Sequence, residues 1–77
     1  MQTKADIELD LSGLTCPMPL LKAKQALNKM EAGQVLKVLA TDPGSERDFQ
    51  VFTEQSGNNL LEFENHEGTF GYLIQKK

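Results

Sequence analysis

The only cysteine of the chain, Cys16, is the side chain best suited to covalent chemistry, and it stands within the segment Gly-Leu-Thr-Cys-Pro-Met-Pro at residues 13–19. A lone thiol cannot close a disulfide within its own chain, so its chemistry must involve another molecule. Proline is tolerated in the first turn of a helix, where N–H groups lack intrahelical acceptors. We therefore expect Cys16 at a helix N-cap, with Pro17 and Pro19 in the first turn and the amide of Met18 as its main free donor.

A thiol in that position would lie at the positive end of the helix dipole. The dipole favours a thiolate by about 0.3–1 kcal/mol, and at most by ~2 kcal/mol. This predicts a pKa of Cys16 below its ordinary value and a nucleophilic sulfur that needs no dedicated base. The single histidine, His66, falls in a distant hairpin, and there is no second cysteine to resolve a disulfide. The pattern indicates a group that accepts a cargo and passes it on, without turnover of its own.

The totals describe one small domain over residues 1–77, with 39% hydrophobic and 25% charged residues, a composition typical of globular chains. The sequence offers neither a disulfide framework nor a Cys/His set for structural zinc. We expect a cytoplasmic protein, because the first residues are polar and no apolar run approaches the length of a membrane span. The net charge of −3 argues against nucleic-acid binding.

The basic residues are unevenly placed. The stretch 11–30 contains Lys22, Lys24 and Lys29 and no acidic residue, although the chain as a whole is acidic. This is either an ordinary solvated helix face or a positive surface near Cys16 that helps partners to dock.

Hydrophobic periodicity predicts the order βαβαββ. Alternation predicts a strand over 6–11, a three- and four-residue period predicts a helix over 17–30 that Gly33 caps, and a continuous apolar run predicts a central strand over 35–40. A second helix over 45–55 should turn Phe49 and Phe52 to the core, and a hairpin should join strands 59–65 and 69–76. Since the first strand alternates cleanly, one sheet face should be open to water. The fold class is α+β, a two-layer sandwich with both helices on the other face.

Both helices would start at the carboxyl ends of parallel strands, which places Cys16 beside the turn at 42–45. Ser45 and Asp48 have the spacing of a capping box with Asp in the usual Glu position. For Asp42, Ser45 and Asp48 we therefore expect turn and capping roles first, and contact with a partner second.

The segment 9–19, with its Gly-Leu-x-Cys-Pro-x-Pro pattern, resembles the signature of the TusA/SirA/YedF sulfur-carrier family. The Asp-Pro-x-Ser-x-x-Asp segment at 42–48 and the strand around Tyr72 are also similar to that family. The resemblance implies a mixed four-stranded sheet. It further implies that Cys16 carries sulfur as a persulfide, with no cofactor beyond this cargo. The supporting residues would be Gly13, Pro17, Met18 and Pro19, and the partner contacts would come from Lys22, Lys24, Asp42, Pro43, Ser45 and Asp48.

The resemblance also implies partners. A cysteine desulfurase or a rhodanese would be the sulfur donor, and a DsrE/TusD-like or other protein would be the acceptor, for tRNA thiolation, sulfur oxidation or molybdenum cofactor assembly. Other relatives have been tied to selenium metabolism. The carrier itself is expected to be a monomer.

Two alternatives stay open at this point. One is a small regulatory or nucleic-acid- or protein-binding module of the SirA type, which would need a basic binding face. The other is a monothiol redox sensor, which would need a groove for a small thiol.

Overall fold

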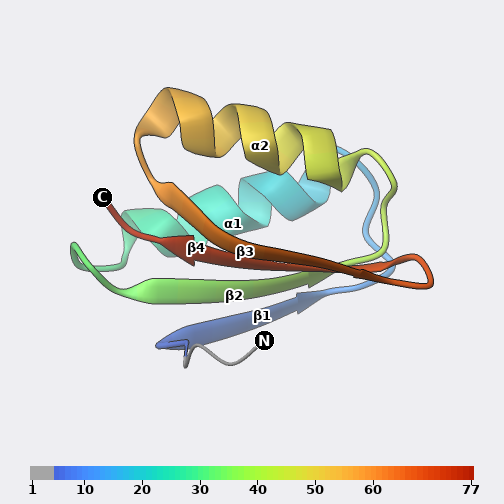
Figure 1. The fold of residues 1–77 in the computed structure, drawn as a ribbon, viewed down its shortest axis with the longest axis horizontal. Helices are drawn as coiled ribbons and strands as arrows, with labels where there is room; N and C mark the ends of the chain where they lie inside the picture. Colours follow the sequence, from blue (N-terminus) through green and yellow to red (C-terminus); the bar gives the residue numbers. More distant parts are fainter. Residues whose placement is uncertain (1–4) are drawn as a thin grey trace.

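The computed structural model describes residues 5–77 and confirms the order βαβαββ (Figure 1). The elements are β1 (Ile7–Leu11), α1 (Met18–Asn28), β2 (Val35–Ala40), α2 (Ser45–Ser56), β3 (Asn59–His66) and β4 (Thr69–Gln75). Neither helix of this part of the chain is long and apolar enough to cross a membrane.

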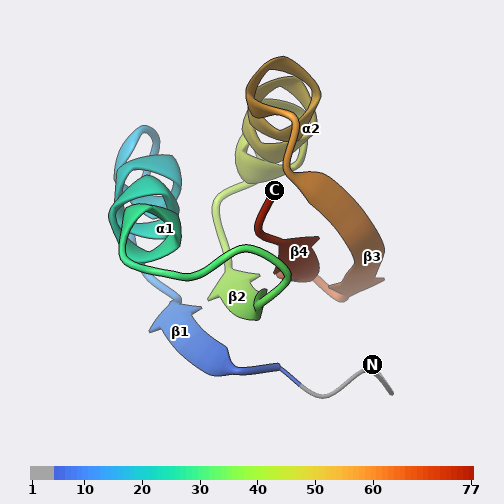
Figure 2. The same ribbon diagram turned by 90° about the vertical axis from the view of Figure 1, so that its left-hand side faces the viewer.

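The four strands form one mixed sheet in the order β1-β2-β4-β3. β1 and β2 are parallel, whereas β4 runs antiparallel to both β2 and β3. Figure 2 shows both helices on the same side of the sheet, with α1 packed against β1 and β2, and α2 against β4 and β3. The predicted two-layer α+β fold is therefore confirmed.

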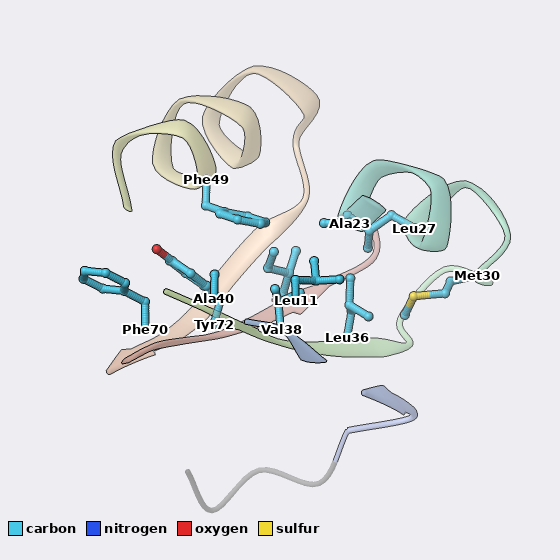
Figure 3. Packing of buried hydrophobic residues seen from close by; sticks show 11 residues of the cluster. Leu11, Ala23, Leu27, Met30, Leu36, Val38, Ala40, Phe49, Phe70 and Tyr72 are labelled. Carbon is cyan, nitrogen blue, oxygen red and sulfur yellow. The ribbon is translucent and has the colours of Figure 1, made fainter. Parts of the chain in front are cut away.

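The core fills the space between the sheet and the helices. β2 contributes Leu36, Val38 and Ala40, and β4 contributes Phe70, Tyr72 and Ile74, all buried (Figure 3). The helices cover them with the buried side chains of Ala23, Leu27 and Phe49, with Met30 following α1. Phe52 lies only half-buried at the margin of this cluster, because it faces the space between the two helices.

The opposite sheet face carries most of its charge in two rows of paired residues. One row runs Glu8, Lys37, Leu73 and Glu62, and the next runs Asp10, Leu39, Gly71 and Glu64. Residues that pair directly across neighbouring strands share a face. This face is therefore acidic, with four carboxylates and one lysine in the two rows. Nζ of Lys37 lies 3.6 Å from Oε1 of Glu8.

The predicted cap of the first helix is wrong. α1 ends at Asn28, and its C-cap residue Lys29 keeps a right-handed backbone. Gly33 instead forms the turn before β2, with a φ of 89°, and its N–H donates to the carbonyl of Lys76 at 2.9 Å. Gly33 does adopt the positive φ that a glycine allows, but it lies beyond the end of the helix at Asn28.

The packing predicts a sharp difference between two leucines of α1. Leu27 is 1% exposed and Leu21 is 43% exposed. Leu27→Ala should lower the free energy of unfolding by about 2–5 kcal/mol, because it leaves a cavity in the core. Leu21→Ala should change it by less than about 0.5 kcal/mol. Urea unfolding followed by circular dichroism measures both, and equal losses would contradict this description of the core.

Candidate functional site at Cys16

The loop that presents Cys16 is fastened to the end of β2. Gly13 adopts a φ of 85°, a left-handed backbone that favours glycine, although a Cβ there would meet no other atom within 4 Å. Its N–H donates to Oγ1 of Thr41 at 2.8 Å, and the N–H of Leu14 donates to the carbonyl of Leu11 at 3.2 Å. The role of Thr41 was not predicted from the sequence. Its position directly after the central strand, at the sheet edge expected for the site, could have indicated it.

Cys16 lies one residue before the position predicted for it. The N-cap of α1 is Pro17, so Met18 and Pro19 are the first and second helical residues. The peptide bond between Cys16 and Pro17 is cis. The N–H of Met18 donates to the carbonyl of Thr15 at 2.9 Å, so the expectation of a free donor there is wrong. Cys16 itself is exposed, as a thiol that meets other proteins must be.

The thiol of Cys16 forms a hydrogen bond with Asp48, a residue for which the sequence predicted a helix-capping role. Sγ of Cys16 donates a hydrogen bond to Oδ2 of Asp48 over 3.1 Å, between residues 32 positions apart in the chain. The pKa of Cys16 is raised, first by this hydrogen bond, then by partial loss of solvation, and then by the charges of Asp48 and Asp42. The predicted lowering is therefore wrong. A full carboxylate charge in contact with the sulfur outweighs the partial charge at a helix end.

Asp48 is free to reach the sulfur because the expected capping box does not form. Ser45 is the first residue inside α2 and Gly44 is its N-cap, so no side chain caps this helix. The buried hydroxyl of Ser45 shares a hydrogen bond of 2.7 Å with the hydroxyl of Tyr72 instead. The prediction of a capping role for Ser45 and Asp48 is therefore wrong, since the serine lies too far into the helix and bonds to the core.

Tyr72 fixes the start of α2 against the sheet. Its ring stacks on that of Phe49 with a centroid distance of 4.4 Å, and neither side chain is exposed. Burial raises the pKa of Tyr72, and either hydroxyl can donate in its hydrogen bond with Ser45. These two contacts, at positions 45 and 49, flank Asp48 in the sequence and hold the helical turn that carries it.

Asp42 adds a second negative charge near the sulfur. Its backbone carbonyl accepts from the N–H of Ser45 at 3.0 Å, which is the turn role that the sequence predicted. Its side-chain Oδ2 is buried and, among residues 5–77, has no hydrogen-bond partner. A Cβ on Gly44 would lie 3.3 Å from that oxygen. Pro43 is exposed in the same turn. Within the described residues, no three His, Cys, Asp or Glu side chains are grouped so that they could hold a metal ion.

The two lysines proposed as partner contacts lie on different sides of α1. Lys24 lines a hollow between α1 and α2 together with Asp48. Lys22 lines a separate hollow between α1 and β1. The structure therefore brings Lys24, and not Lys22, into the surroundings of the Cys16–Asp48 pair.

Comparison with known proteins decides the family. The family model described as "Sulfurtransferase TusA" matches residues 7–76. The chain belongs to the TusA family. It is 56% identical over 71 residues to a protein of Allochromatium vinosum named sulfur carrier protein TusA, a match that covers 92% of this chain and 93% of that one.

Other TusA relatives agree with this placement. A putative sulfur carrier protein of Aquifex aeolicus is 52% identical, over 91% of this chain and 36% of its own longer length. Among solved structures, a SirA-like protein from Desulfitobacterium hafniense superposes with a TM-score of 0.79 at 34% identity, covering 90% of this chain and 95% of that one.

The Cys16–Asp48 contact predicts the effect of a single substitution. Asp48→Asn removes the negative charge that favours the thiol form, so the pKa of Cys16 should fall. Alkylation by iodoacetamide follows the thiolate fraction. Its pH profile should therefore shift to lower pH, and the rate at neutral pH should rise.

Glu46→Gln is the matched control. It removes a carboxylate from the same first turn of α2, but Glu46 acts on Tyr72 and not on Cys16. Its alkylation profile should match that of the wild type. An unchanged or upward-shifted profile in Asp48→Asn would contradict the assigned role of Asp48.

Proposed function

We propose that this protein is a sulfur carrier that receives sulfur as a persulfide on Cys16 and delivers it to an acceptor protein. One observation carries the proposal: the single cysteine is exposed directly before a helix whose N-cap is Pro17. This cysteine stands in a chain that matches the TusA family over residues 7–76. Its relatives in Allochromatium vinosum and Pseudomonas putida are named sulfur carrier proteins.

The transfer step is an exchange at sulfur. The Cys16 sulfur attacks the outer sulfur of a persulfide on the donor cysteine, a new S–S bond forms at Cys16, and the S–S bond of the donor breaks. The donor cysteine leaves as a thiolate and takes up the proton that Cys16 gives up. Atoms and electrons balance without any external oxidant, since the donor changes from persulfide to thiol while Cys16 changes from thiol to persulfide.

Asp48 gives the empty carrier an inert resting state. Because its carboxylate holds the thiol proton, the raised pKa of Cys16 keeps the free sulfur mostly protonated. The thiolate is the reactive form towards persulfides and oxidants alike. Loading requires the thiol proton to leave the sulfur, either onto the Asp48 carboxylate that already accepts its hydrogen bond or after a docked donor displaces Asp48.

The same feature disfavours the redox-sensor alternative. Sensor cysteines have lowered pKa values and are oxidised as thiolates. Cys16 has the opposite shift, caused by the neighbouring Asp48 and Asp42. A carrier benefits from this, because a protonated thiol survives between encounters.

For the partners, we propose a cysteine desulfurase or a rhodanese as donor and a DsrE/TusD-like protein as acceptor, in a relay such as that of tRNA thiolation. The sulfur on Cys16 is the cargo of this relay, and the carrier needs no further cofactor. We further propose that residues 1–77 act as a single domain, as a monomer in the cytoplasm.

Loading by a desulfurase tests the proposal. The purified protein, incubated with cysteine and a cysteine desulfurase, should gain the mass of one sulfur atom, as measured by mass spectrometry of the intact chain. The added mass should disappear on reduction with dithiothreitol.

Cys16→Ser is the matched control and should gain no mass, since it replaces only the sulfur of an exposed side chain. The proposal fails if the wild type gains no sulfur from any desulfurase or rhodanese, or if Cys16→Ser is loaded equally well.

A further inference from the structure

Two adjoining hollows form a groove beside α1 and α2, and the first of them is lined by Asp48, the hydrogen-bond partner of Cys16. Its first half, about 330 Å³, is lined by Leu20, Lys24, Arg47, Asp48, Val51 and Phe52. Its second half, about 340 Å³, is lined among others by Leu27, Lys76 and Lys77. Lys24 and Phe52 belong to both halves, and Nζ of Lys24 lies 5.4 Å from the ring centroid of Phe52. We call this surface the inter-helix groove.

The charge of the inter-helix groove is opposite to that of the whole chain. The chain has 8 basic and 11 acidic residues. The described lining of the groove includes four of the basic ones, Lys24, Arg47, Lys76 and Lys77, and one acidic residue, Asp48 at the Cys16 end. Apolar side chains lie between these charges, and one of them, Val51, is 43% exposed. A basic groove with an apolar floor is complementary to an acidic segment that also carries apolar side chains.

At the far end of the groove, the backbone is held by hydrogen bonds to neighbouring segments. The N–H of Lys77 donates to Oδ1 of Asn58 at 2.8 Å, and Asn58 is itself buried. The N–H of Lys76 donates to the carbonyl of Gln34 at 2.8 Å. These bonds fix the backbone from which two of the four cations extend.

The other large surface offers the opposite chemistry. The open sheet face carries Glu8, Asp10, Glu62 and Glu64 around Lys37. An acidic segment is repelled there and attracted to the inter-helix groove, so the molecule is electrostatically two-sided.

We infer that the inter-helix groove is the docking site for an acidic, partly apolar polypeptide segment of the sulfur-relay partner. The identity of the partner as a relay protein rests on the proposed function. The chemistry of the segment rests only on the groove. A segment lying in the groove reaches Asp48 at one end, so it would guide the partner's sulfur towards Cys16. At about 1.5 Å per residue, the 11 residues of α1 give the groove a length of roughly 16 Å, enough for about five residues of extended chain.

Titration of the ¹⁵N-labelled protein with synthetic peptides tests this inference. The probe is a short peptide in which Glu and Leu alternate, and the matched peptide has Lys in place of every Glu. The Glu peptide should shift the amide signals of α1 and α2 along the groove, more strongly at low salt. The Lys peptide should leave them in place.

Charge-reversal variants locate the interaction. Lys24→Glu combined with Arg47→Glu should weaken binding of the Glu peptide about tenfold, since two exposed cations become anions. Lys29→Glu reverses a charge at the C-cap of the same helix, outside the groove and in the hollow that Lys22 also lines, and should bind like the wild type. The amide spectrum of each variant shows directly whether it is folded.

The inference is overturned if the Glu peptide binds nowhere, if its shifts fall on the open sheet face, or if Lys29→Glu weakens binding as much as the double variant. It is equally overturned if a short single-stranded RNA binds the groove more tightly than the peptide, which would make the surface a nucleic-acid site. Persulfide loading of the wild type is independent of all these readouts. A protein that loads sulfur but ignores the peptide refutes the docking site alone, and one that binds the peptide but takes no sulfur refutes the sulfur carrier alone.

Discussion

The parallel pairing of β1 with β2 is the constraint on which the site depends. Its register sets Leu11 against Ala40, so both strands end at the same edge and the chain leaves them side by side. The Gly13–Thr41 hydrogen bond can then form, and Cys16 comes within reach of the first turn of α2. A slip of one residue would turn Leu9 and Leu11 to the open face, so core packing enforces this register.

Two carboxylates determine the electrostatics at this edge of the sheet. Asp48 and Asp42 raise the pKa of Cys16, which favours its thiol form over the thiolate. A persulfide is more acidic than a thiol, so the persulfide that we propose on Cys16 would place an anion beside the same two carboxylates. Like charges in close contact repel. In the carrier that we propose, this arrangement would keep the empty thiol protonated and favour release of the cargo.

The secondary structure could be predicted from the sequence because it depends on hydrophobic periodicity. The side-chain contacts of the site could not, because their partners lie far apart in the chain. Element order, both helices and the placement of Cys16 near Asp42 followed from apolar spacing and chain topology. The helix start was wrong by one residue: proline is favoured at the first helical position, but Pro17 is the N-cap and Pro19 the second helical residue. The Cys16–Asp48 contact was missed because Ser45 and Asp48 fit a local capping box. The competing partner of Ser45 was Tyr72, 27 residues away.

The central claim is that Cys16 carries sulfur in the cell, with its thiol protected between loadings. Mass spectrometry of the Cys16-containing peptide, from protein isolated under non-reducing conditions and alkylated at once, tests this most directly. The account predicts a fraction of Cys16 as alkylated persulfide and the remainder as alkylated thiol. Cys16 found only as thiol, or as a mixed disulfide with glutathione, would contradict it.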